Sequence, residues 1–519
     1  MPQQEQMSDV LEQAFLLQQK NQHEEAIRLF QQIIEYDPEH SDAHHYIGLS
    51  YMEQNNLSKA IAEMEYSIQL IPDLEDYYCN LGVTYWKNHQ KEKAVACLKK
   101  GLTLNPDNKY ININLAQYLL NLGKFEESLS ECHKILEKYP YDYTVFFILI
   151  ILEHCLCQKN LVASSLNRLV NNTSINIDQW LKEIPENDSK YLFVKGVLFV
   201  TFGKNNQGYR YLKKAEQQDP GAGWIFTYKT ILQIKHYYGP ILFSDTSPEH
   251  GTRPESDYSG TITMSDLGIY GRLGHQIQYY LGLKLYARRH KLYIETSDWA
   301  GRYFFDGCND PYISQIYKSI DSKDPSLIQS FNGNCPPPRK KFNLRDGFYV
   351  QPRTLEEKKF IQQILKPRRY WKEKLEKSIL LLKKNKKTLL SIHIRRGDFL
   401  KGGYYVPPNQ LYLEWLEQIW PHLPQPVLYI ASDEIESVKA DFYKFSPFIS
   451  ENLDNQFYFD DFFTDFYVLS QSDIVVLGQS SFSRIAAMCN EKCSQFYYTN
   501  PETQTIEPFK LWPFIDSDN

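Results

Sequence analysis

The sequence predicts an α-helical repeat array followed by an α/β region. Two observations carry this expectation. A 34-residue period of small, large and proline residues runs through the first half, and strand-length apolar runs alternate with helix-length stretches after residue 260. At 519 residues the chain is long enough for two or three domains. We expect the repeat array over 8–235, a linker over 236–259 and the α/β domain over 260–510.

The period of the first half is marked by three sets of residues. Small residues recur at Ala14, Gly48, Gly82 and Ala116 and again at Ala26, Ala60, Ala94 and Ser128, the larger ones are Phe30, Met64, Leu98 and Cys132, and the prolines are Pro38, Pro72, Pro106 and Pro140. Small residues let two antiparallel helices approach, larger ones fill the gap, and proline ends the second helix. This pattern resembles the tetratricopeptide repeat.

The phase weakens over 141–183 and returns once more. Gly196, Gly208, Leu212 and Pro220 repeat the same internal spacing. Such arrays present extended surfaces to proteins or peptides. The alternative is a packing module that supports the second half or a dimer.

Composition excludes several classes of protein. A net charge of −6 argues against nucleic acid as the main partner. The longest clean apolar run, Val145 to Leu152, is too short for a membrane span. The first residues lack the basic and apolar segments of a secretory signal, and nine cysteines occur without a CxxC pair. These features indicate reduced thiols and a cytoplasmic location.

The α/β region opens with a strand, a glycine turn and a helix. A strand over Thr261 to Met264 precedes the turn, a helix runs to His290, and Leu292 to Thr296 form the next strand. Gly271 and Gly274 would let backbone amides approach a ligand at the positive end of that helix. The alternative for these glycines is a tight turn without a ligand.

The rest of the region alternates in the same way. Residues 300–345 look irregular and are expected to be an insertion or lid. The other expected helices are 354–365, 370–384, 411–420, 462–470 and 482–490, and the other expected strands are 388–394, 426–431 and 473–477.

Polar residues follow three of these strands. Arg395, Arg396 and Asp398 follow the first, residues 432–434 the second and residues 478–483 the third. Ligands of open α/β sheets bind outside the carboxyl ends of the strands. Two adjacent guanidinium groups repel each other unless an anion separates them, and a diphosphate fits their planar forks. The sequence therefore predicts a site for a phosphate-bearing ligand.

Four motifs occur in an order that resembles the protein O-fucosyltransferases and the α1,2- and α1,6-fucosyltransferases. They are GRLGHQ at 271–276 with YLG at 280–282 and Trp299, HIRRGD at 393–398, SDE at 432–434, and DFYVLS at 465–470 with SSFS at 480–483. The resemblance covers about residues 260–500. It implies a GT-B fold of two Rossmann-like halves, GDP-fucose as donor, inversion at the anomeric carbon, no cofactor and no essential metal.

The chemistry of these residues and the resemblance together predict roles for individual residues. Arg395 would bind the diphosphate, Arg396 would share it or form a structural ion pair, and Asp398 would orient Arg395 or cap the next segment. The alternative for both arginines is a solvated strand end. His393 and Asp433 would bind guanine. Alternatively, His393 is a satisfied core histidine, and Asp433 caps the helix that follows it.

The third strand end supplies the remaining donor contacts. Ser480, Ser481 and Phe482 would lie by the phosphates, with capping of the following helix as the alternative reading. Together with Gly271, Gly274, His393, Arg395 and Asp433 they form the expected donor site.

One position departs from the family pattern. His275 stands where asparagine is frequent, so it could donate to the diphosphate, act as a base or signal another donor sugar. The candidates for the general base are His275, Asp398 and Glu434. The expected function is transfer of fucose from GDP-fucose to a glycan or glycoprotein, with the repeat array binding the acceptor or a partner. The alternatives are transfer from another nucleotide sugar and a non-catalytic scaffold with a nucleotide-binding domain.

Overall fold

The structure, a computed structural model, divides the chain into two units. It describes residues 2–157, 161–172, 177–242, 258–269, 271–315, 317–331, 335–345, 347, 352–384, 388–401, 403–453, 457, 459, 462–493 and 495–513. The first unit comprises Met1–Glu153 and Asn160–Ser174, and the second comprises His154–Lys159 and Ile175–Asn519. Among the described helices, none combines the length and the apolar character that crossing a bilayer requires.

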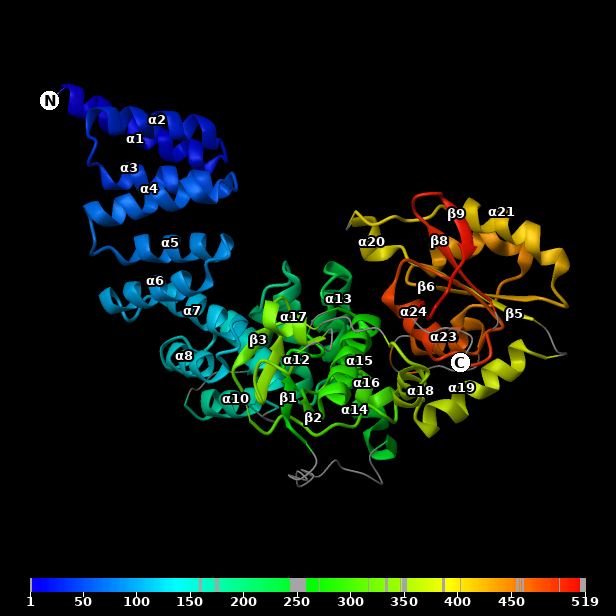
Figure 1. Ribbon diagram of the computed structural model, residues 1–519. Helices are drawn as coiled ribbons and strands as arrows, with labels where there is room; N and C mark the ends of the chain where they lie inside the picture. The colour runs from blue at the N-terminus through cyan, green and yellow to red at the C-terminus, as the bar shows by residue number, and fades with distance from the viewer. Residues whose placement is uncertain are drawn as a thin grey trace. The chain divides into compact units, whose positions relative to one another are not determined.

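The first unit consists of helices arranged largely as successive pairs, which Figure 1 shows in blue and cyan. Its helices are α1 (Pro2–Gln19), α2 (His23–Tyr36), α3 (Ser41–Glu53), α4 (Leu57–Leu70), α5 (Glu75–Lys87), α6 (Lys91–Leu104), α7 (Lys109–Asn121), α8 (Phe125–Lys138), α9 (Tyr143–Leu156) and α10 (Leu161–Asn172). The last residues of α9 belong to the second unit. Four pairs, α1–α2 to α7–α8, follow the four clear periods of the sequence.

The periodic glycines lie where the two helices of a pair touch. A Cβ added to Gly48 would be 2.7 Å from Cγ of Met64, and one added to Gly82 would be 2.9 Å from Cδ2 of Leu98. Met64 and Leu98 are fully buried. The predicted packing of a small residue against a large one is therefore confirmed.

The second unit contains one more repeat, which is formed by α12 (Ser189–Thr201) and α13 (Asn205–Gln218). The helices of this part of the unit are α11 (Ile177–Glu183), α12, α13 and α14 (Gly223–Leu242). A Cβ on Gly196 would meet Cγ of Leu212 at 2.7 Å, as in the earlier pairs. Because α14 continues to Leu242, the first part of the expected linker is helical; residues 243–257 lie outside the described part of the chain.

Helix α14 packs into the core of the α/β region. Its buried residues Phe226, Ile231, Ile234 and Tyr238 share one apolar cluster with residues of both sheets. The ring of Tyr238 lies 5.0 Å from that of Trp371. The helix that follows the last repeat is thus part of the core of the second unit.

The first sheet is parallel and has the strand order β2-β1-β4-β3. Its strands are β1 (Gly260–Met264), β2 (Leu292–Thr296), β3 (Ser319–Asp321) and β4 (Lys341–Arg345), and its helices are α15 (Leu273–His290), α16 (Gly301–Phe304) and α17 (Pro325–Phe331). Residues 300–345 therefore contribute two strands, and the expectation of an insertion or lid was wrong. These strands are short, and their partners lie far away in the sequence.

The second sheet has the order β6-β5-β7-β8-β9, with only β9 antiparallel. Its strands are β5 (Leu389–Ile394), β6 (Val427–Ser432), β7 (Ile474–Leu477), β8 (Gln495–Asn500) and β9 (Thr505–Pro508). The helices after residue 350 are α18 (Leu355–Ile364), α19 (Arg369–Leu382), α20 (Gly397–Lys401), α21 (Asn409–Ile419), α22 (Ile435–Val438), α23 (Phe462–Gln471) and α24 (Ser481–Met488), with short 3-10 helices at Trp420–His422, Lys439–Phe445 and Ser450–Asn452. Of these, α18 lies against α15, since Glu357 pairs with Arg289.

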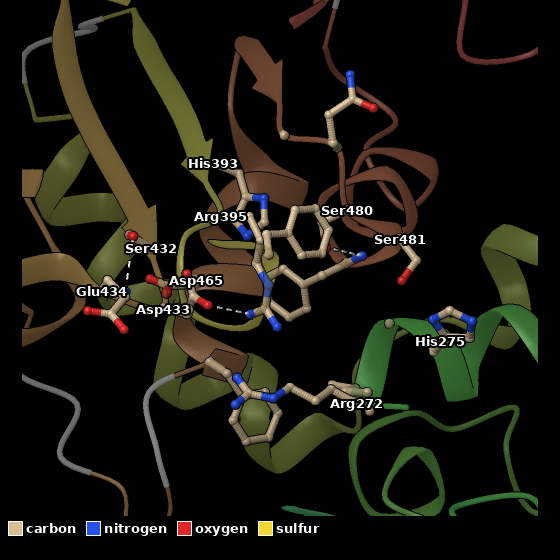
Figure 2. A pocket seen from close by; sticks show the side chains of 18 of the residues that line it. Arg272, His275, His393, Arg395, Ser432, Asp433, Glu434, Asp465, Ser480 and Ser481 are labelled. Carbon is tan, nitrogen blue, oxygen red and sulfur yellow. Dashed lines mark hydrogen bonds and ion pairs between the residues drawn. The ribbon is translucent and has the colours of Figure 1, made fainter. Parts of the chain in front are cut away.

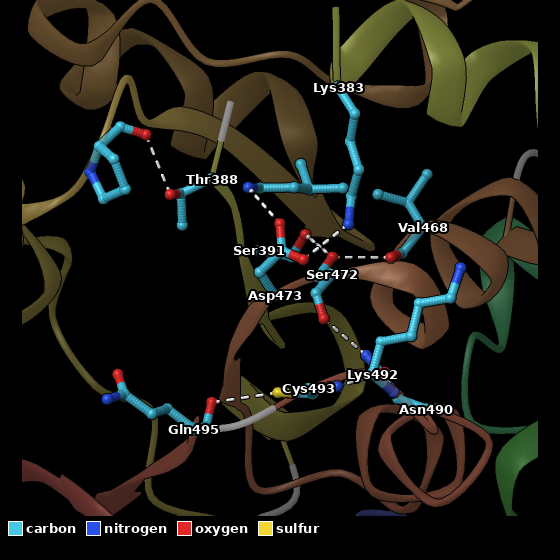
Figure 3. A network of polar contacts seen from close by, with 12 residues as sticks. Lys383, Thr388, Ser391, Val468, Ser472, Asp473, Asn490, Lys492, Cys493 and Gln495 are labelled. Carbon is cyan, nitrogen blue, oxygen red and sulfur yellow. Dashed lines mark hydrogen bonds and ion pairs between the residues drawn. The ribbon is translucent and has the colours of Figure 1, made fainter. Parts of the chain in front are cut away.

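A polar network fixes the beginnings of β5 and β7 (Figure 3). The carboxylate of Asp473 accepts from the backbone N–H of Leu389 at 2.9 Å, and the hydroxyls of Ser391 and Ser472 lie 2.5 Å apart. Asn490 donates to the carbonyl of Ser472 at 2.8 Å. Because the starts of the two strands are held in register, their carboxyl ends are aligned.

Candidate functional site

A cavity of about 1090 Å³ lies within the second unit, and several segments line it. They are the ends of β5, β6 and β7 with the residues after them, the start of α15, Ser450 and Glu451, parts of α23 and the C-terminal β8–β9 region, and residues 213–226 around the connection of α13 to α14. Figure 2 labels side chains from the three strand ends, from the start of α15 and from α23. The structure thus brings polar groups from three strand ends to one cavity.

Arg395 is held at the cavity by an acidic partner. Its Nη1 lies 2.9 Å from Oδ2 of Asp433, and both side chains are largely buried. Oδ1 of Asp433 accepts from the backbone N–H of Arg396 at 2.8 Å. The guanidinium carbon of Arg395 also lies 5.5 Å from the ring centre of Phe399. In this arrangement Asp433 anchors the β5 end.

The side chain of Arg396 points away from the cavity. It does not line the cavity, and its Nη2 donates to Oδ1 of Asn409 at 2.6 Å. Asn409 in turn donates to Asp441 at 2.7 Å. Successive side chains of an extended segment point in opposite directions. The expectation that both guanidinium groups face one anion therefore differs from the structure, which gives Arg396 a structural position.

His393 is a buried, uncharged group at the cavity. The side chain is 5% exposed, and its Nδ1 has no hydrogen-bond partner among the described residues. Burial, followed by the positive charge of Arg395, lowers the pKa of His393 to about 3. Gly478 makes room for the ring, since a Cβ there would lie 2.9 Å from Nδ1. Burying Nδ1 without a partner is costly, whereas the residue itself lines the cavity.

The depressed pKa of His393 predicts acid sensitivity. Between pH 6.5 and about 3 the unfolded chain binds a proton at this residue that the folded chain does not. The free energy of unfolding should therefore fall as the pH falls below 6.5, by roughly 1.4 kcal/mol per pH unit from this group. We expect the His393→Gln variant to lose less stability than the wild type between pH 7 and pH 5 in chemical denaturation. Parallel pH profiles for the two proteins would contradict a neutral His393.

Two helix starts meet beside the strand ends. A Cβ on Gly274 would lie 2.5 Å from the backbone nitrogen of Phe482, so the glycine permits α15 and α24 to touch. Ser480 caps α24, because its Oγ accepts from the N–H of Phe482 at 3.2 Å. Gly271 has a φ of +68°, a left-handed conformation that favours glycine. Gly271, Gly274, Ser480, Ser481 and Phe482 all line the cavity, but the space beside Gly274 is filled by α24.

The candidate bases occupy different positions. His275 lines the cavity, and its ring lies 5.1 Å from that of Tyr279 in an edge-to-face arrangement. Partial desolvation lowers the pKa of His275 below its usual value. Glu434 is exposed and also lines the cavity. Asp398 lies in α20, but its side chain is outside the described part of the structure.

Several lining residues were given no role from sequence. Arg272 projects from the start of α15, and Asp465 of α23 accepts from the hydroxyl of Tyr429 at 2.6 Å. Arg272 belongs to the motif at 271–276 and Asp465 to the motif at 465–470, so their positions in these motifs could have indicated a role. Lys213 and Phe226 lie in the segment assigned to the repeat array. The sequence carried no signal that this segment would reach the α/β site.

Comparison with known proteins identifies the repeats. Residues 11–74 and 75–108 match tetratricopeptide repeat family models. The N-terminal repeats are tetratricopeptide repeats. No curated protein matches the chain.

Several solved structures resemble part of the chain. PilF of Pseudomonas aeruginosa is 16% identical, with 43% of this chain and 96% of that chain covered and a TM-score of 0.35. YrrB, described as a TPR protein with an unusual peptide-binding site, is 18% identical, with 41% and 85% covered and a TM-score of 0.25. The first TPR of Spaghetti (RPAP3), bound to an HSP90 peptide, is 16% identical, with 22% and 92% covered and a TM-score of 0.22.

Proposed function

We propose that the second unit is an inverting glycosyltransferase that moves fucose from GDP-fucose to a glycan or glycoprotein acceptor. The observation that carries the proposal is the cavity at the carboxyl ends of β5, β6 and β7, where Arg395 and neutral His393 lie together. Two sheets with helices contribute to the second unit, as expected for a GT-B enzyme. The order of the four motifs, which resembles that of the fucosyltransferases, supports GDP-fucose as the donor.

The chemistry follows from the groups at the cavity. When the sugar–phosphate bond breaks, negative charge develops on the leaving diphosphate, and the guanidinium of Arg395 stabilises it. His393 hydrogen-bonds the base of the nucleotide from the buried end. A base removes the proton of the acceptor hydroxyl, and His275 and Glu434 are the described candidates.

Asp433 takes a different part from the one first expected. Its two oxygens already bind Arg395 and the backbone of Arg396. We propose that Asp433 positions Arg395 for the diphosphate. Each carboxylate oxygen still has accepting capacity, so a contact to the guanine edge is compatible with this role.

The repeats supply the partner site of the proposal. Tetratricopeptide arrays bind proteins and peptides along their extended surfaces. We propose that the first unit holds the acceptor protein, or a protein that delivers it.

Nucleotide binding by the full-length chain tests the proposal. At a hundred times the dissociation constant, GDP should stabilise the second unit by about 2.7 kcal/mol and raise its melting temperature, whereas the same concentration of UDP should not. Release of free sugar from GDP-fucose, GDP-mannose, UDP-GlcNAc and UDP-galactose, with and without EDTA, then identifies the donor. We expect release from GDP-fucose that EDTA does not reduce.

The other results point elsewhere. Equal shifts from GDP and UDP would favour another nucleotide sugar, a reading that His275 in place of the frequent asparagine already suggests. No shift from either nucleotide would contradict the nucleotide site itself.

A further inference from the structure

The loop that precedes α15 is in direct contact with the start of α14, the helix that follows the last repeat. A Cβ on Gly223, the first residue of α14, would overlap the carbonyl of Gly271. The backbones of these two segments therefore touch, because both residues at the contact are glycines. Gly271 lines the cavity, and so does Phe226 of α14, so the start of α14 lies against the site.

Polar contacts tie the same two segments together. The buried amide of Gln276 donates to the carbonyl of Gly271 at 3.0 Å and also to Oγ1 of Thr227. The Thr227 hydroxyl donates in turn to the carbonyl of Gly223 at 3.0 Å. Thr227 thus links α14 to Gln276, and Gln276 links it to Gly271 in the loop before α15, which we call the glycine loop.

The side chain of Arg272 is held by the same segment. Its Nη2 donates to the carbonyl of Pro220 at 3.0 Å, and its guanidinium carbon lies 6.0 Å from the ring centre of Phe226. Phe226 is itself fixed by an edge-to-face contact with Phe462, whose ring centre is 5.0 Å away. Figure 2 shows Arg272 reaching from the start of α15 toward the part of the cavity that holds Arg395. The carbonyl is neutral, so it orients the guanidinium without cancelling its charge.

We propose that residues 220–227, from the end of the last repeat to the beginning of α14, are positioning residues for the site, and that Thr227 is the central one. They set the position of the glycine loop and the direction of Arg272, although they lie outside the α/β part of the chain. A site held by a second layer of hydrogen bonds is preorganised, and displacements of the supporting groups reduce its affinity for ligand. The effect on nucleotide binding rests on the proposed function, whereas the positioning of the loop does not.

The test compares three substitutions in α14. Thr227→Val has nearly the same shape but cannot accept from Gln276, and Thr227→Ser keeps the hydroxyl. Thr230→Val is the matched control, because the Thr230 side chain is fully buried and its hydroxyl has no partner among the described residues. Two measurements are made on the full chain: hydrogen–deuterium exchange of the amides of 271–276, and the dissociation constant for GDP.

We expect Thr227→Val to speed exchange in the glycine loop severalfold and to weaken GDP binding by about three- to tenfold, as loss of one buried hydrogen bond implies. Thr227→Ser and Thr230→Val should stay within about twofold of the wild type in both measurements. Unchanged exchange in Thr227→Val, or equal changes in Thr227→Val and Thr230→Val, would overturn the positioning role. If the wild type fails to bind GDP, the proposed function is contradicted, and the exchange data still decide whether Thr227 positions the loop.

Discussion

A fragment of residues 260–519 should fail to form a native core. It contains every predicted motif of the α/β region but lacks α14, whose residues Phe226, Ile231, Ile234 and Tyr238 are at most 6% exposed and lie in the shared apolar cluster. Burying each of four such side chains contributes about 1.5–3 kcal/mol, or roughly 6–12 kcal/mol together. This is comparable with the whole stability of a typical domain, which is about 5–15 kcal/mol.

The matched fragment is residues 141–519, which keeps α9 to α14. We expect it to show a single cooperative thermal transition by near-ultraviolet circular dichroism, whereas 260–519 should show weak near-ultraviolet signal and bind a hydrophobic dye. A cooperative transition of 260–519 at a similar temperature would show that α14 is dispensable. The same fragments separate folding from partner binding, because both lack the four N-terminal repeat pairs.

Replacing Arg395 by lysine should reduce sugar transfer by about a hundredfold or more, the loss typical of removing one donor to a developing anion. Lysine keeps the positive charge for Asp433 but loses the planar fork that binds two oxygens of a diphosphate. The substitution therefore removes the proposed chemistry with less damage to the buried ion pair than alanine would cause. The turnover number with GDP-fucose and the GDP dissociation constant measure the effect.

The neighbouring arginine provides the control. Arg396→Lys is the same chemical change one residue away, at a side chain that does not line the cavity and binds Asn409. We expect its turnover number to stay within about tenfold of the wild type, with its main effect on the melting temperature. Equal losses of activity in the two variants would contradict the assignment of the diphosphate to Arg395 alone.

The parts of the fold that the sequence predicted are those encoded by local patterns. A helix pair is specified by residues within one 34-residue period, and the Gly48–Met64 contact lies within a single pair. The strand β5 is likewise encoded locally, because four of its six residues are leucine or isoleucine. By contrast, β3, β4, β8 and β9 are three to six residues long and include exposed positions, so their pattern resembles irregular chain. They become strands because neighbouring strands pair with them.

The amino-acid pattern alone determined that helical repeats precede an α/β region and that Arg395, Asp433 and Ser480 follow strands, because periodicity and strand ends are properties of adjacent residues. Only the tertiary structure decided which groups meet. It paired Arg395 with Asp433, filled the space beside Gly274 with α24, and placed Thr227 and Pro220 behind the glycine loop. Each of these contacts joins segments that are distant in the sequence, and the smallest separation, between Arg395 and Asp433, is 38 residues. Such contacts follow from how helices and sheets pack, which no short stretch of sequence encodes.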